Sequence, residues 1–396
     1  MSSRIEPPIV EERRDFAEVL TGIVIGLGLT FTLIAMFAIP LAGNSVGTRD
    51  FVEYWAAGHQ LVLHASPYDP GAIAALERSA GCETLIVMLN PPWTLPLVYP
   101  LGFLSLKWAA LLWNLLLLVC VLISVSLVRL MHNSPPNRIH WLALAFTPLI
   151  LALAMGQLSI LALFGLVLFL RFHQHRPFLS GAALWLCALK PHVFLPFAAA
   201  LFAWILATRS YKLFVGAAAA VTVTTAAAFL IDPHAWSEYI YIVHTGLKEQ
   251  FIPCVADAFR HWLDPQAQWL GYVPAAAACV WAPIYYWRQR SSWSWTANGS
   301  LLILISLAVA PYGWFYDQCC ALPAILHGAY VTHSRNHLAA LALLILLADV
   351  QLCAVKSVSP LTSPLWLWTV PAWLAWFLFA RASAEKKSVV TPIAPI

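Results

Sequence analysis

The sequence predicts an all-α polytopic membrane protein with about eleven to thirteen transmembrane helices. The 396-residue chain is 61% hydrophobic and only 10% charged, whereas soluble domains carry about a quarter charged residues. Apolar runs recur along the whole chain, and most of the 22 Lys and Arg residues fall in alternate connections between these runs. The net charge of +4 comes without a basic cluster, so nucleic acid is not an expected partner.

The first apolar run covers 17–42 and is longer than the core of a cleavable signal peptide, so we expect it to remain as the first span. Further runs follow near 109–130, 140–154, 157–171, 178–189, 193–207, 213–231, 269–287, 298–311, 317–331, 337–353 and 363–380. Several are shorter than the roughly 20 residues of a full span, which is typical of tilted or broken helices. The proline-rich segment 91–106 is interpreted as a re-entrant or interfacial piece rather than a span.

The distribution of basic residues predicts the orientation of the chain. If both termini are cytoplasmic, most Lys and Arg lie on the inner side of the plasma membrane and most Asp and Glu lie outside. The same orientation places the unusual polar motifs on the outer face. We therefore expect a single transmembrane domain over 1–396, with its site covered by the outer loops 43–108 and 232–268.

The outer stretch from Gly47 to Pro70 is the most unusual part of the sequence. It combines three charged residues with two aromatic ones: Arg49, Asp50, Glu53, Tyr54 and Trp55. A fixed carboxylate such as Asp50 can act as a general base on a hydroxyl group, and aromatic rings suit the apolar faces of sugars. A structural interpretation remains open. Asp50 and Glu53 also have the spacing of a helix capping box, and the aromatic residues equally suit the membrane interface.

Other polar residues stand at the outer ends of later apolar runs. Lys190 precedes Pro191-His192 and is predicted to lie on the outer side, whereas most basic residues are predicted to lie inside, so we expect it to bind phosphate. A cation at a membrane boundary can also simply extend its side chain toward water. Gln157 follows Gly156 and could bind a sugar or cap a turn. The long outer loop adds Lys248 and Arg260 as further candidate phosphate ligands.

The stretch 311–318 places an acid and several aromatic rings at the start of another run. Trp314, Tyr316 and Asp317 are its candidate site residues. An acid at membrane depth is costly and is often functional, while Asp317 could equally cap a helix. The sequence contains no phosphate-binding loop, serine nucleophile elbow or zinc-ligand pair, so we expect neither a metal nor a cofactor.

Taken in order, these stretches resemble glycosyltransferase family 87, which belongs to the GT-C superfamily. The resemblance is carried by DFVEYWAAG with PYDP, NPPWTLPLVYPLGFL, MGQLSILALFGLVLFLR with ALKPHVFLPF, and APYGWFYDQCCALPAIL. It implies a GT-C-like bundle with a short amphipathic helix in the first outer loop, an outward-facing site, and a polyprenyl-phosphate donor that carries mannose or arabinofuranose. It also implies Asp50 as the catalytic base, Lys190 in a Lys-Pro motif and Gln157 in a Gly-Gln motif.

The sequence departs from the family in its last motif. The family pattern commonly reads Ser-Trp-x-His-His, whereas Trp314 is followed here by Phe315, Tyr316, Asp317 and Gln318. The absent His pair bears on donor choice and on activity.

The sequence therefore predicts an integral-membrane hexosyltransferase or pentosyltransferase of a cell-envelope glycan. It would move a sugar, mannose before others, from polyprenyl phosphate to a glycan or glycolipid acceptor among the membrane lipids. In this hypothesis Asp50 deprotonates the acceptor, and Lys190, helped by Arg260 or Lys248, holds the donor phosphate. The sugars contact a larger set: Arg49, Glu53, Tyr54, Trp55, Gln157, His192, Trp314, Tyr316 and Asp317.

Two alternative functions stay open. A flippase or transporter of lipid-linked sugars would need polar residues through the membrane depth, whereas here they collect at one face. An inactive GT-C-like scaffold is favoured by the missing His pair.

Overall fold

A computed structural model of the chain describes residues 26, 49–82, 86–245, 251–332, 334–354 and 360–390. In these residues the regular structure is entirely helical, which confirms the predicted fold class. Within this described part of the chain, five helical stretches are long and apolar enough to cross a membrane: α6 (Leu106–Met131), Pro191–Thr208 with α10 (Leu195–Thr208), α11 (Tyr211–Ile231), α17 (Arg335–Ala354), and Pro364–Glu385 with most of α18 (Thr369–Val390). The chain is thus a multi-pass membrane protein. The expected first span, 17–42, lies outside the described residues apart from residue 26.

The shorter apolar runs form broken helices, as expected from their length. Three of them begin with a 3₁₀ turn that leads into an α-helix: η5 (Ile139–Ala145) before α7 (Thr147–Met155), η8 (Gln268–Tyr272) before α14 (Val273–Gln289), and η10 (Phe315–Ala321) before α16 (Leu322–Val331). Each of these α-helices carries a proline in its first two positions. Proline suits this place because the first turn needs no backbone N–H donor there. Two further short helices are α8 (Ser159–Phe172) and α15 (Asn298–Val309).

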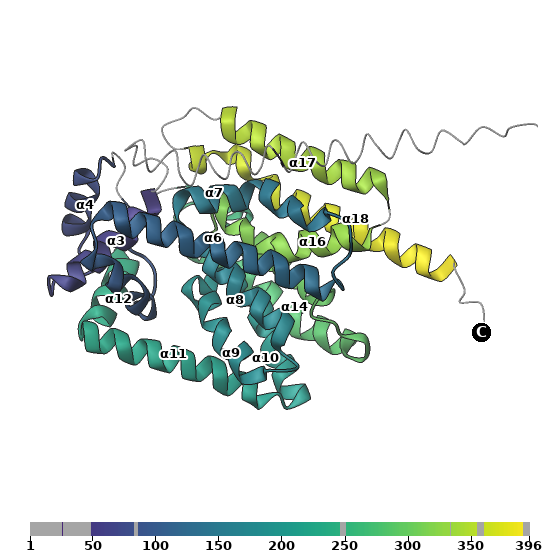
Figure 1. Cartoon of the computed structure of the whole chain (residues 1–396), viewed down its shortest axis with the longest axis horizontal. Helices are drawn as coiled ribbons and strands as arrows, with labels where there is room; N and C mark the ends of the chain where they lie inside the picture. Colours follow the sequence, from purple (N-terminus) through teal and green to yellow (C-terminus); the bar gives the residue numbers. More distant parts are fainter. Residues whose placement is uncertain are drawn as a thin grey trace, which may run out of the picture.

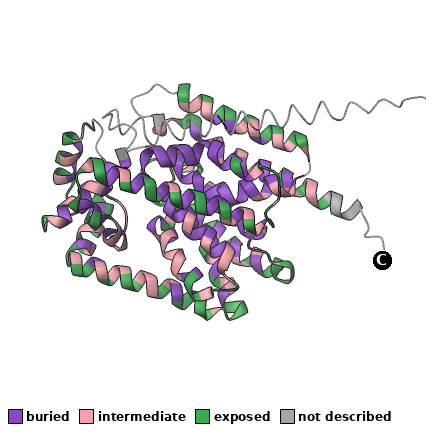
Figure 2. Cartoon of the chain, in the orientation of Figure 1, coloured by how far each residue is buried: buried purple, intermediate pink, exposed green. Residues whose placement is uncertain are grey.

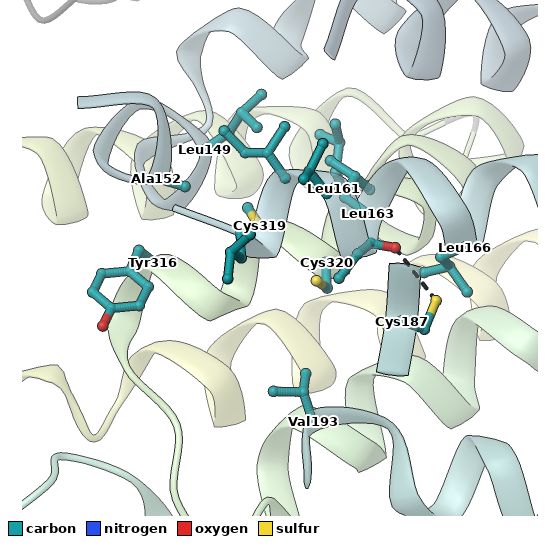
Figure 3. Close-up of a cluster of buried hydrophobic side chains, with 14 of the residues drawn as sticks. Leu149, Ala152, Leu161, Leu163, Leu166, Cys187, Val193, Tyr316, Cys319 and Cys320 are labelled. Carbon is teal, nitrogen blue, oxygen red and sulfur yellow. Dashed lines mark hydrogen bonds between the residues drawn. The ribbon is translucent and has the colours of Figure 1, made fainter. Parts of the chain in front are cut away.

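The buried core lies among α6, α7, α8 and α16, and the long helices α11 and α17 lie at opposite edges of the bundle (Figures 1 and 2). α8 is apolar and almost wholly buried. Figure 3 shows leucine side chains of α7 and α8 close to three buried cysteines from η6 (Leu184–Leu189) and η10: Cys187, Cys319 and Cys320. α11 is equally apolar, but most of its residues are not buried, which is typical of a lipid-facing helix.

α3 (Arg49–Val62) packs beside the proline-rich segment, and α4 (Pro70–Ser79) packs against α3. That segment breaks into η3 (Pro92–Thr94), α5 (Leu95–Val98) and η4 (Tyr99–Phe103), which confirms that it is not a full span. α3 and η4 cross closely at Gly58 and Gly102. A Cβ on Gly58 would lie 2.3 Å from the Val98 oxygen, and one on Gly102 would lie 2.1 Å from the Gly58 oxygen. This crossing fixes the position of α3 against the bundle.

Candidate active site

The inner face of α3 carries two acids and a tyrosine. Asp50, Glu53 and Tyr54 share one side of the helix through their i, i+3, i+4 spacing, and none is more than 6% exposed. Burial, and then the nearby charges of Glu53 and Asp50, raise the pKa of Tyr54 well above its usual value, so its hydroxyl stays protonated and can donate. On another side of the helix, the Trp55 indole donates to the Leu104 carbonyl at 2.9 Å and anchors α3.

The turn between α7 and α8 directs Gln157 toward α3. Gly156 has φ +69°, a conformation that favours glycine. A Cβ at Gly156 would also lie 2.7 Å from the Cβ of Phe51, so a side chain is excluded for two reasons. The Trp113 indole donates to the Gly156 carbonyl at 2.7 Å. These contacts fix the turn and the direction of the Gln157 side chain.

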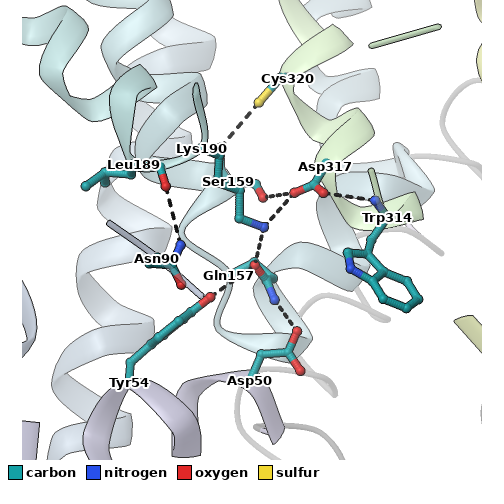
Figure 4. A network of polar contacts seen from close by, with 10 residues as sticks. All are labelled: Asp50, Tyr54, Asn90, Gln157, Ser159, Leu189, Lys190, Trp314, Asp317 and Cys320. Carbon is teal, nitrogen blue, oxygen red and sulfur yellow. Dashed lines mark hydrogen bonds and ion pairs between the residues drawn. The ribbon is translucent and has the colours of Figure 1, made fainter. Parts of the chain in front are cut away.

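The Gln157 amide bridges Asp50 of α3 and the buried Lys190 (Figure 4). Its Nε2 donates to Asp50 Oδ2, while its Oε1 accepts from Lys190 Nζ at 2.8 Å and from the Tyr54 hydroxyl at 3.3 Å. The partners determine the orientation of the amide, because an ammonium can only donate and an ionised carboxylate can only accept. Asp50 and Lys190 therefore face opposite ends of a single amide group.

Lys190 also forms a buried ion pair with Asp317. The Nζ–Oδ1 distance is 2.7 Å, and the two side chains are 9% and 2% exposed. Asp317 accepts further hydrogen bonds from the Ser159 hydroxyl and from the Trp314 backbone N–H at 2.9 Å. The ammonium of Lys190 lies 4.8 Å from the centre of the Tyr316 ring, a cation–π geometry. Because each charge would be costly without the other in this buried place, Lys190 and Asp317 form one electrostatic unit.

The backbone around Lys190 is held by the proline-rich segment. Lys190 stands at the break between η6 and η7 (Pro191–Phe194). The Trp93 indole donates to the Ala188 carbonyl at 2.9 Å, and the Asn90 amide donates to the Leu189 carbonyl at 3.3 Å. The two residues before Lys190 are therefore fixed from the same segment that packs on α3.

Two other predicted site residues, His192 and Trp314, each stack on a tyrosine. His192 stacks on Tyr312, with ring centroids 3.7 Å apart. Trp314 stacks on Tyr316 with centroids 6.3 Å apart. Two stacked aromatic pairs, His192 with Tyr312 and Trp314 with Tyr316, therefore lie close in sequence to Lys190 and Asp317.

Arg260 has local partners on α13 (Val255–Leu263) and the turn that follows it. It donates to Asp257 at 2.8 Å and to the Pro265 carbonyl at 2.7 Å. Its guanidinium is therefore engaged in holding this segment together. All of Lys248 and the side chain of Arg49 lie outside the described residues.

Sequence reasoning did not select Ser159, Asn90 or Trp93. Ser159 stands two residues after Gln157, and that proximity was an available signal. Asn90 and Trp93 flank a Pro-Pro pair, but their bonds to the backbone before Lys190 join segments about a hundred residues apart. No local pattern reports such a pairing.

A narrow pocket lies beside the network, with a free volume of about 20 Å³, enough for about one water molecule. Its lining comes from four parts of the chain: Val193; Pro253, Cys254 and Val255; Leu307, Ala310, Gly313, Trp314, Asp317 and Gln318; and Trp366, Leu367 and Val370. Among the described residues, no group of three or more His, Cys, Asp or Glu is arranged to hold a metal ion.

Comparison with known proteins gives one match. The family model of glycosyltransferase family 87 matches residues 89–348, which is more than half of the chain and includes Gln157, Lys190 and Asp317 but not α3. No curated protein and no solved structure matches the sequence.

Proposed function

The chain belongs to glycosyltransferase family 87, and from this membership we propose that it transfers a sugar from a polyprenyl-phosphate donor to a hydroxyl of a lipid or polysaccharide acceptor. The sugar is a hexose, mannose before others, or a pentose. The site faces the outside of the plasma membrane in this proposal, with both termini cytoplasmic, because that orientation keeps most Lys and Arg on the inner side.

Asp50 is the general base in this proposal. It takes the proton of the acceptor hydroxyl, and the acceptor oxygen forms a new bond to C1 of the sugar. The bond between C1 and the phosphate oxygen breaks, and its electron pair stays on the departing polyprenyl phosphate. Lys190 stabilises the negative charge of that leaving group. A single in-line displacement of this kind inverts the configuration at C1.

The observation that carries the proposal is the bridge through Gln157. A base and a leaving-group cation must sit on two sides of one reacting carbon, at a separation that does not vary from turnover to turnover. Gln157 donates to Asp50 and accepts from Lys190 at 2.8 Å, so one side chain fixes both groups. Its role in this proposal is to position them, in addition to any contact with a sugar.

The test is transfer by the purified protein in nanodiscs from a panel of radiolabelled polyprenyl-phosphate sugars, including mannose and arabinofuranose. Asp50→Asn should lower transfer by at least about 100-fold, with the thermal unfolding midpoint close to that of the wild type. Asp264→Asn makes the same change at an exposed position and should keep full activity. Normal transfer by Asp50→Asn would remove the role given to this residue.

A further inference from the structure

The short helix α13 has its polar and apolar sides reversed relative to a helix on a water-facing surface. Its inward side carries Asp257 and Arg260, which form an ion pair at 2.6 Å and are both about 95% buried. Its outward side is an apolar stripe at helical spacing: Val255, Phe259, Trp262 and Leu263. Of these, Trp262 is 81% exposed. Water would penalise this arrangement twice, because an exposed apolar stripe is unfavourable and a buried ion pair costs desolvation.

Past the end of α13, an exposed turn carries Asp264 and Gln266, and exposed apolar side chains then resume. Trp269 is 66% exposed, and Tyr272 and Val273 are also exposed. α13 packs against η8, α14 and α15, and the outward side of α14 is itself apolar, with Val280, Trp281, Ile284 and Trp287 exposed. Trp and Tyr are enriched where helices meet the lipid headgroups. The exposed apolar side chains of α13 and its following turn therefore lie beside the exposed apolar side of α14.

We propose that the segment from α13 to the start of α14, residues 255–273, lies in the headgroup–acyl boundary of the bilayer leaflet on the side of the site, with Trp262, Leu263, Trp269 and Tyr272 in contact with phospholipid. The Asp257–Arg260 pair and the bond from Arg260 to the Pro265 carbonyl at 2.7 Å keep the helix and its turn rigid on the protein side. A short amphipathic helix can lie at the membrane interface when one of its sides is apolar, as it is here.

The position of α13 gives this seating a consequence for the site. Cys254 and Val255, at its beginning, line the narrow pocket beside Asp317. The wall of the pocket would therefore continue directly into the leaflet surface, at the level where a lipid-linked donor carries its phosphate. This consequence rests on the proposed function, whereas the seating of α13 does not.

The test measures the environment of single fluorescent labels in nanodiscs. Cys279 and Cys353, which are not buried, are first replaced by alanine, and an environment-sensitive dye is attached to Trp262→Cys or, separately, to Trp269→Cys. We expect blue-shifted emission and several-fold stronger quenching by lipids with a nitroxide near the headgroup than by aqueous iodide. Ser79→Cys, on the exposed side of α4, is the matched control and should show the opposite ratio.

Two results would overturn the proposal. Iodide quenching at both 262 and 269 equal to that at the control position would show that the face lies in water. Protection of both labels from iodide and from the lipid nitroxide would show that protein, such as a second copy of the chain, covers the face instead. Neither result depends on catalytic activity, so failure of this inference is distinguishable from failure of the proposed function.

Discussion

Gln157→Glu should move the pH at which activity appears. In the wild type the Gln157 Nε2 group donates to Asp50, and a donor of this kind stabilises the ionised form of a carboxylate. The substitution puts an oxygen in place of that donor while leaving the shape of the side chain almost unchanged. Two carboxylates then meet in a buried place, where they must share a proton or repel each other.

The size of the effect follows from the geometry. Two unit negative charges about 4 Å apart repel by about 4 kcal/mol at an effective dielectric constant of 20, which corresponds to about 3 pKa units. Lys190 donates to the same side chain at 2.8 Å, so it favours the ionised form of a glutamate at 157 and leaves the extra proton on Asp50. Because the base must be ionised to act, we expect the acid limb of kcat/KM to rise by about 1–3 pH units, with activity recovering above it.

The measurement is the pH profile of kcat/KM for transfer from a polyprenyl-phosphate sugar. The matched control is Gln266→Glu, which makes the same change in an exposed turn and should leave the profile in place. A merely structural role for Gln157 would lower activity at every pH without moving the limb. An acid limb identical to that of the wild type, with transfer still measurable, would refute the link between Gln157 and Asp50.

Three further experiments test the network and the turn that positions Gln157. Lys190→Met leaves Asp317 charged and buried without its partner, so the free energy of unfolding should fall by about 3–5 kcal/mol. Adding Asp317→Asn to this variant should restore part of the lost stability. The wild type, the two single variants and the double variant are compared by thermal unfolding, and stability losses that simply add would contradict the ion pair. Gly156→Ala should lower the free energy of unfolding by about 1–3 kcal/mol, because the positive φ and the Cβ of Phe51 at 2.7 Å both exclude a side chain. An unchanged thermal unfolding midpoint would contradict this reasoning. Tyr54→Phe removes one hydrogen bond and should cost about 1 kcal/mol. Because the pKa of Tyr54 is raised well above 10.0, the alkaline limb of activity should not move, and a shift in that limb would show that Tyr54 titrates during turnover.

The elements of this fold were predictable because lipid leaves few choices for a backbone that must satisfy its own hydrogen bonds. The apolar runs that lie within the described residues are helical, and the proline-rich segment 91–106 forms short helical turns. A helix formed at Asp50 and Glu53 as α3, but it includes Arg49, so Asp50 lies in its first turn and not at the capping position. Helix breaks were predictable from length but not in position, because the choice between a 3₁₀ turn and an α-helical turn depends on packing against neighbouring helices.

The assembly of the site was less accessible to sequence reasoning. The sequence predicts four residues of the network separately: Asp50, Gln157, Lys190 and Asp317. It links them only through the prediction that all four lie on the same side of the membrane. Contacts between segments more than a hundred residues apart, such as Lys190 to Asp317 at 2.7 Å, follow from the packing of whole helices. Arg260 is a different case, because Asp257 stands three residues earlier on one helix, and that spacing already favours the ion pair that forms.

The departure in the last motif has a physical meaning in this structure. The two positions where the family pattern commonly has its His pair hold Tyr316 and Asp317, and both contact Lys190, one through its ring and one through its carboxylate. Lys190 has three N–H donors, and two of them are given to Gln157 and Asp317. A donor phosphate can thus reach the ammonium through one further N–H, or it must displace a partner. In the proposed function, the carboxylate of Asp317 would compete with the donor phosphate for Lys190, whereas a neutral histidine at this position would not. We therefore expect the choice of donor to differ here from family members that keep the His pair.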